Sequence, residues 1–208
     1  TTYTLTASNA NGSETASLTV MVVVPGEPLI SEFMASNGGA SVVDEDGQSS
    51  DWIEIHNPSG NTALLSGYYL TDDPDDLQKW AFPAVSLAPL DHLVVFASGK
   101  DRIVPGSELH ANFSLDADGE YLALIKPDGQ TIVSEFGFAG TRYPEQEADL
   151  SFGTFGNPPQ AGYFDTATPG AANGTGFLGF VADTKFDTNR GFYDMSRGPT
   201  SKFLCWPR

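Results

Sequence analysis

The chain has 208 residues, of which 27 are acidic and 10 are basic, so its formal net charge is −17. A field of that sign repels phosphates, which argues against a nucleic-acid partner and against binding to anionic lipid. Hydrophobic residues make up 40% of the chain, enough for a packed core, while one cysteine excludes an internal disulfide and no apolar stretch reaches the ~20 residues of a membrane-inserted helix.

Residues 1–24 predict a separate β-hairpin. Apolar and polar residues alternate on both sides of Asn9-Ala10-Asn11-Gly12, whose residues tolerate the positive φ of a tight turn. A lone hairpin is marginally stable in water. We therefore interpret residues 1–24 as two strands of a sheet whose other strands are missing, followed by a linker at residues 25–28.

The predicted domain spans residues 29–174. Its residues 29–136 alternate short apolar segments with turns rich in glycine, proline and aspartate, and no apolar stripe of helical period accompanies them. The predicted strands span residues 29–34, 52–56, 68–71, 79–82, 92–97, 121–126 and 131–136. The predicted fold class is all-β: an immunoglobulin-like antiparallel β-sandwich with a separate N-terminal β-hairpin and an irregular C-terminal tail.

The end of the predicted domain and the tail after it differ in composition. Within residues 137–174, the rings of Phe152, Phe155, Tyr163 and Phe164 are too apolar for a free linker, so we expect this segment to wrap over the sandwich and bury them. Residues 175–208 indicate a linker and the truncated start of a further β module. Residues 195–208 contain three bases and no acid, which leads to the hypothesis that they are not native sequence.

Several segments in the middle of the chain resemble lamin tail domains. The resemblance begins with Asp51-Trp52-Ile53-Glu54-Ile55-His56-Asn57 and continues with Leu65-Ser66-Gly67-Tyr68-Tyr69-Leu70-Thr71-Asp72. Trp80-Ala81-Phe82-Pro83, Leu93-Val94-Val95-Phe96-Ala97, Tyr121-Leu122-Ala123-Leu124 and a closing Thr168-Pro169-Gly170-Ala171-Ala172-Asn173 follow in the order of that family. The resemblance implies an immunoglobulin-like sandwich without enzymatic activity of its own.

The flanking segments resemble other modules. Residues 1–20 are similar to the last strands of bacterial immunoglobulin-like or polycystic-kidney-type repeats, and residues 181–194 are similar to the opening of the C-terminal module of chitobiase-type hexosaminidases. Such neighbours imply a bacterial multidomain protein that is secreted or displayed at the cell surface.

Two acidic loops are candidates for a calcium site, because calcium takes six to eight oxygen ligands. The candidate ligands are Asp44, Asp46 and Asp51 in the first loop, and Asp72 and Asp73 in the second. Neither loop has the spacing of a helix-flanked calcium loop. We favour solvated acidic turns over calcium binding at both places, and we expect no other cofactor.

Other polar and aromatic residues have a structural and a functional interpretation. Glu54 lies in an otherwise apolar strand, where it is either a general acid or a structural hydrogen-bond acceptor, and we favour the acceptor. The three histidines, His56, His92 and His110, lack the spacing of a zinc site. Four tyrosines, Tyr68, Tyr69, Tyr143 and Tyr163, could stack on sugar rings, although core packing is the default for aromatic residues in a sandwich.

These observations predict a non-catalytic interaction or spacer module of a large exported protein. The expected partner is a protein or a polysaccharide at the cell surface, and we expect the chain to be a monomer. The alternative is an accessory substrate-binding module of an extracellular enzyme, kinase-like or hydrolase, whose catalytic domain lies outside this sequence.

Overall fold

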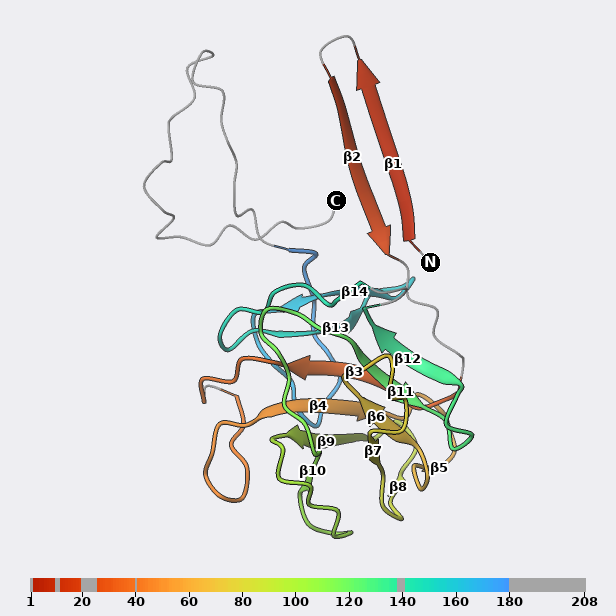
Figure 1. The fold of residues 1–208 in the computed structure, drawn as a ribbon, viewed down its shortest axis with the longest axis vertical. Helices are drawn as coiled ribbons and strands as arrows, with labels where there is room; N and C mark the ends of the chain where they lie inside the picture. The colour runs from red at the N-terminus through yellow and green to blue at the C-terminus, as the bar shows by residue number, and fades with distance from the viewer. Residues whose placement is uncertain (1, 10–11, 20–25, 40, 138–140, 180–208) are drawn as a thin grey trace. The chain divides into compact units, whose positions relative to one another are not determined.

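A computed structural model of the chain describes residues 2–9, 12–19, 26–39, 41–137 and 141–179 (Figure 1). β1 (Thr2–Asn9) and β2 (Gly12–Thr19) form the predicted antiparallel hairpin, in which Asn9 lies opposite Gly12. Internal contacts divide the chain into one unit that ends at Gly176 and a second unit that begins at Phe177. The module predicted from residue 181 onward, including residues 195–208, lies outside the described residues.

The larger sheet of the sandwich has six strands in the order β10-β9-β4-β3-β13-β14. Its strands are β3 (Leu29–Met34), β4 (Asp51–His56), β9 (His92–Ala97), β10 (Leu109–His110), β13 (Ser151–Phe155) and β14 (Gln160–Phe164). All neighbouring strands run antiparallel except β10, which pairs in parallel with β9. The pairing therefore brings the end of the domain, in β13, against its first strand, β3.

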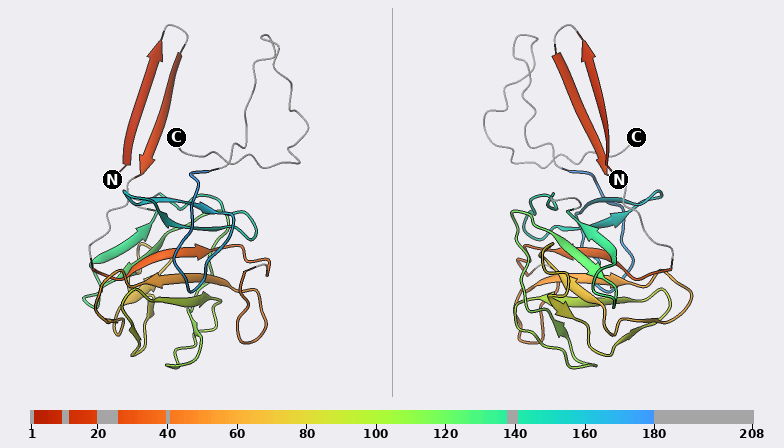
Figure 2. Two further views of the ribbon diagram at one scale, coloured as in Figure 1. Left: turned by 180° about the vertical axis from the view of Figure 1, so that it is seen from behind. Right: turned by 45° about the vertical axis from the view of Figure 1, so that its right-hand side comes forward.

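The second layer is a four-stranded sheet in the order β12-β11-β6-β7. It contains β6 (Tyr69–Thr71), β7 (Trp80–Ala81), β11 (Leu122–Ile125) and β12 (Ile132–Phe136), while β5 (Ala63–Leu64) and β8 (Ser86–Leu87) form a separate two-stranded ladder. Figures 1 and 2 show this sheet packed against the β3 and β4 region of the larger sheet. The predicted all-β sandwich is confirmed.

The core between the two layers follows from the two-residue period of strands. Phe33, Ile53 and Val95 lie side by side on β3, β4 and β9, and all three are fully buried. The ring of Phe33 lies 5.1 Å from that of Phe136 on β12 and 5.7 Å from that of Phe152 on β13. Aromatic residues from both layers thus fill the space between the sheets.

The opposite face of the larger sheet is also buried. Met34, Trp52 and Phe96 line up across β3, β4 and β9 and form a second apolar cluster, against which Ala167 packs. We call residues 165–173 the exit strap. Figure 2, seen from behind, shows it crossing in front of the β3 and β4 region of the sheet. The sheet is therefore covered on both faces in its central part.

The strand predictions agree with the structure best where a strand is long. β3 and β9 have the predicted bounds, and the other five predicted strands are displaced by one residue at an end or shortened. The short strands β5, β8 and β10 were not predicted. Residues 137–174 do bury Phe152, Tyr163 and Phe164, but they add a regular hairpin, β13 and β14, to the sheet, and Phe155 stays half-buried.

Within the described residues there is no helix of the length and apolarity that crossing a membrane requires.

Candidate functional site

The first acidic loop is organised around the carboxylate of Asp44, which is buried. One of its oxygens accepts hydrogen bonds from the backbone N–H groups of Asp46 and Gln48, at 3.0 and 2.9 Å. The other accepts from Ser50 Oγ at 2.8 Å and from Lys100 Nζ at 2.5 Å. Burial alone would raise the pKa of Asp44, but these donors outweigh it and hold the pKa at about 2. Asp44 therefore serves to fold the loop.

The same loop is paired with residues 100–110 through a network of opposite charges. Lys100 Nζ lies 2.8 Å from Asp46 Oδ2, and Arg102 contacts both Asp46 and Glu45, at 2.7 and 2.5 Å. Beside these ion pairs, Nε2 of the buried His110 lies 2.8 Å from Glu45 Oε2. Asp44 and Asp46 thus lie close together, as the calcium hypothesis required. Their carboxylates both contact the ammonium group of Lys100.

Asp51 accepts hydrogen bonds from other donors than Asp44 does. Its Oδ1 accepts a long hydrogen bond from the backbone of Asn37, at 3.4 Å. Burial raises the pKa of Asp51 to about 6, because this backbone donor and one from Leu115 only partly replace water.

The second acidic loop also uses its carboxylates internally. Asp72 Oδ1 lies 2.5 Å from Lys79 Nζ, and Asp73 Oδ1 accepts from the backbone N–H of Asp75 at 2.9 Å. The buried Thr71 hydroxyl donates to the carbonyl groups of Asp73 and Asp76. The calcium hypothesis for Asp72 and Asp73 stays a prediction, and the geometry favours the turn interpretation.

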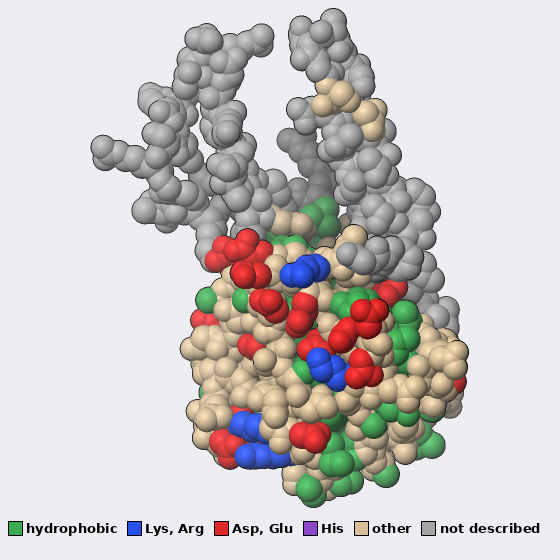
Figure 3. Space-filling view, in the orientation of Figure 1, with side chains coloured by type: hydrophobic (Ala, Val, Ile, Leu, Met, Phe, Trp, Pro, Cys, Tyr) green, Lys and Arg blue, Asp and Glu red, His purple; other side chains and the backbone are tan. Residues whose placement is uncertain are grey.

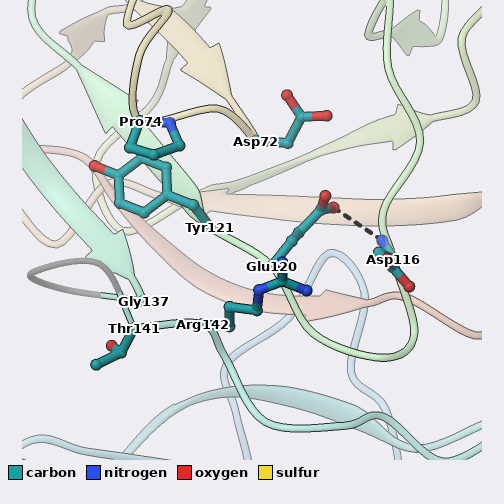
Figure 4. A pocket seen from close by; sticks show the side chains of 8 residues that line it. All are labelled: Asp72, Pro74, Asp116, Glu120, Tyr121, Gly137, Thr141 and Arg142. Atoms are coloured by element: carbon teal, nitrogen blue, oxygen red, sulfur yellow. Dashed lines mark hydrogen bonds between the residues drawn. The ribbon is translucent and has the colours of Figure 1, made fainter.

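A pocket of about 310 Å³ opens between this loop and residues 116–120. Its lining includes Asp72, Asp116 and Glu120, together with Tyr121 and Arg142 (Figure 4). Glu120 Oε1 accepts from the backbone N–H of Asp116 at 2.8 Å. Burial raises the pKa of Glu120, and the charge of Asp72 raises it further. The lining holds three carboxyl groups and one guanidinium group, so acidic side chains are in excess there.

We call the loops 72–76 and 116–120 around this pocket the acidic face. They contain seven carboxylates, and the basic residues beside them are Lys79 and Arg142. Figure 3, in the orientation of Figure 1, shows acidic side chains gathered on the face turned toward the viewer, with a few basic side chains among them. Sequence reasoning identified the loop 72–76 but missed its pairing with residues 116–120, because the two loops are about forty residues apart in the chain.

Two buried glutamates form a further cluster, on the outer face of the larger sheet. Glu32 and Glu54 lie opposite each other on β3 and β4, and neither is exposed to solvent. Glu54 accepts from Ser31 Oγ at 2.5 Å and from the backbone N–H of Gly170 at 2.6 Å. Glu32 accepts from Ser151 Oγ and, at 2.8 Å, from Thr168 Oγ1. Both carboxylates therefore bind the exit strap, and Glu54 is the hydrogen-bond acceptor that its structural interpretation predicted.

The remaining candidates from the sequence are two histidines and four tyrosines. The rings of His56 and His92 stack at 4.2 Å, and His92 Nε2 lies 3.9 Å from Glu54. Tyr143 and Tyr163 are buried, and their hydroxyl groups donate to backbone carbonyl groups. Tyr68 and Tyr69 are half-buried. No pair among these four tyrosines forms an exposed aromatic platform in the described part of the chain.

The two packed sheets and their filled core define an immunoglobulin-like β-sandwich. The sequence profile of the lamin tail domain matches residues 24–139, which is more than half of the chain. The chain therefore belongs to the lamin tail domain family. No curated protein matches the sequence.

Proposed function

We propose that this chain is a non-catalytic interaction and spacer module of a larger exported bacterial protein. Membership of the lamin tail domain family supports an immunoglobulin-like module. Sandwiches of this kind hold loops on a rigid frame, which suits partner binding and spacing. The resemblance of the flanking segments to modules of bacterial exported proteins supports a secreted or cell-surface location.

The environment of Glu54 is the observation that carries the non-catalytic part of this proposal. Its side chain is not exposed, and its two oxygens accept hydrogen bonds from Ser31 and Gly170. A general acid must come within hydrogen-bond reach of a substrate. The exit strap occupies that place, so Glu54 fastens the chain to itself.

The acidic face is the surface best suited to a partner. Seven carboxylates on two adjoining loops favour a protein that offers lysine or arginine side chains, and the attraction would also speed association. A polysaccharide partner is supported less well, because Tyr143 and Tyr163 are packed inside the sandwich.

Binding to a lysine-rich peptide, with a glutamate-rich peptide and a neutral polysaccharide for comparison, tests this surface. We expect binding to the lysine-rich peptide alone, and we expect added salt to weaken it. The double variant Asp75→Asn/Asp118→Asn should weaken binding, since it removes two exposed charges from the acidic face. The matched control Glu147→Gln/Asp165→Asn removes two exposed charges elsewhere and should have less effect. Equal effects of the two variants would refute the acidic face as the binding surface.

The alternative is that the module helps an extracellular kinase-like or hydrolytic enzyme to bind its substrate. Gene sequence on both sides of this chain would distinguish the two proposals, because the alternative requires an adjoining catalytic core. Phosphodiesterase and glycosidase assays on the chain itself address a third case. Robust turnover that Glu54→Gln abolishes would overturn the non-catalytic proposal.

A further inference from the structure

Three metal-ligating side chains meet where the first acidic loop packs against residues 100–110. Glu45, Glu108 and His110 each offer one ligand atom, and these atoms all lie within 4.8 Å of one another. The turn 44–48 holds Glu45, and the short parallel strand β10 with the residue before it holds the other two. Residues two apart in an extended segment point to the same side, so Glu108 and His110 can face one ion.

The position and orientation of the His110 imidazole suit a metal ligand. The ring is fully buried and lies against the ring of Phe96, with 5.3 Å between the ring centres. Nδ1 lies 2.8 Å from Ser98 Oγ, while Nε2 points at Glu45. The contact between Nε2 and Glu45 requires a proton between the two atoms, and a metal ion would take the place of that proton while Nδ1–H donates to the serine oxygen. This orientation by a second hydrogen bond is typical of histidines that bind metals.

The balance of charge around the three residues leaves a negative excess. Lys100 and Arg102 neutralise Asp44, Asp46 and Glu45 only in part, and none of the ion pairs found in the described residues includes Glu108. The backbone N–H of Glu45 donates to Glu108 Oε2 at 2.6 Å, which holds the two glutamates side by side. Two adjacent carboxylates repel each other unless a proton or a cation lies between them.

We propose that Glu45, Glu108 and His110 bind a divalent first-row transition ion, with Zn²⁺ as the best fit. One imidazole nitrogen and two carboxylate oxygens are a donor set that zinc accepts, with water in the fourth position. Calcium fits less well, because it takes six to eight oxygens. The bound ion joins the turn 44–48 to the 100–110 loop, and this proposal does not depend on the proposed partner binding.

Calorimetric titration of the chelator-treated chain with ZnCl₂, alongside thermal unfolding, tests the site. We expect one ion per chain and a melting temperature higher by several degrees at saturating zinc, with no comparable effect of CaCl₂. Co²⁺ bound at the same site should show visible absorption that zinc displaces.

Variants distinguish this site from adventitious binding. Glu108→Gln changes an exposed side chain and should lower the affinity at least tenfold, whereas Glu147→Gln, an exposed control, should not change it. Arg102→Met removes a cation that competes for Glu45 and should raise the affinity. A chain that binds no zinc at millimolar concentration, or one whose zinc affinity is unchanged in Glu108→Gln and in Glu45→Gln, would overturn the proposal.

Discussion

The buried glutamates show how single residues are tuned by their surroundings. Burial raises the pKa of Glu54 to about 7, against the hydrogen bonds from Ser31 and Gly170, and the charge of Glu32 raises it further. Burial likewise raises the pKa of Glu32, against donors from Ser151 and Thr168. Both side chains give up favourable hydration in order to hold the exit strap.

This tuning predicts a dependence of stability on pH. A carboxyl group whose pKa is raised by folding binds more protons in the folded chain than in the unfolded chain. Its contribution to the free energy of unfolding is therefore full below pH 4.5 and declines as the pH rises toward 7. Glutamine resembles the protonated form. We therefore expect Glu54→Gln to gain stability relative to the parent between pH 5 and pH 8, by at most ~3 kcal/mol. Urea unfolding at both pH values measures the gain, and a difference that does not change with pH would contradict it.

The pKa of Asp44 is shifted in the opposite direction, because folding lowers it. All four acceptor positions of its carboxylate are filled by Asp46, Gln48, Ser50 and Lys100, so no lone pair remains for calcium. Asp44→Asn should destabilise the chain by about 2–3 kcal/mol, because it replaces a charged acceptor with a group that also donates. Thermal unfolding measures the loss. Millimolar calcium should leave the melting temperature of the parent chain nearly unchanged, and a rise of several degrees would support the calcium hypothesis.

At the scale of elements, the pairing of the β13–β14 hairpin with the rest of the larger sheet depends on a close approach between β13 and β3. Gly153 faces Glu32 in the ladder, and a Cβ atom at this position would lie 2.2 Å from the carbonyl oxygen of Ser31. The exit strap then covers this junction, where Asn173 Nδ2 donates to the carbonyl groups of Ser31 and Thr154, at 2.8 and 3.0 Å. The junction therefore has no space for a side chain at position 153.

Gly153→Ala should destabilise the domain by about 2 kcal/mol or more, because the backbone of β3 must move to admit the methyl group. Gly174→Ala is a matched control, since a Cβ atom at that position has nothing within 4 Å. The difference between the two should appear as a melting temperature lower by several degrees in the first variant alone. Equal melting temperatures would show that β13 is not held closely against β3.

At the scale of the whole molecule, the sandwich extends beyond the matched family profile. The profile ends at residue 139, whereas β13 and β14 supply two of the six strands of the larger sheet. Phe33 in the core contacts the rings of Tyr143 and Phe152, which both lie after the profile ends. The packed core therefore includes residues that the family match does not cover.

Two fragments test this extension. A chain of residues 26–179 should unfold in one cooperative transition, because it retains both sheets and the exit strap. A chain of residues 26–139 should not, since it exposes the core face of Phe33 and leaves the edge of β3 unpaired. Thermal unfolding followed by circular dichroism compares them. Cooperative unfolding of the shorter fragment near the temperature of the longer one would show that β13 and β14 are dispensable.

The sequence by itself determined the fold class, the bounds of β3 and β9, and which side chains of a strand share a face. In β4, Trp52 and Glu54 share one face and Ile53 and Ile55 share the other, because this alternation is a local property of the extended chain. The resemblance to lamin tail domains also rested on local segments, and the family match confirms it.

Only the tertiary structure decided what each polar side chain contacts. It paired Glu54 with Gly170, and it brought Glu45 to Glu108 and His110 across more than sixty residues. The acidic face likewise arises because two distant loops line one pocket. Such contacts depend on the order and register of strands that are far apart in the chain, and a local pattern contains no information about which distant segment will lie beside it.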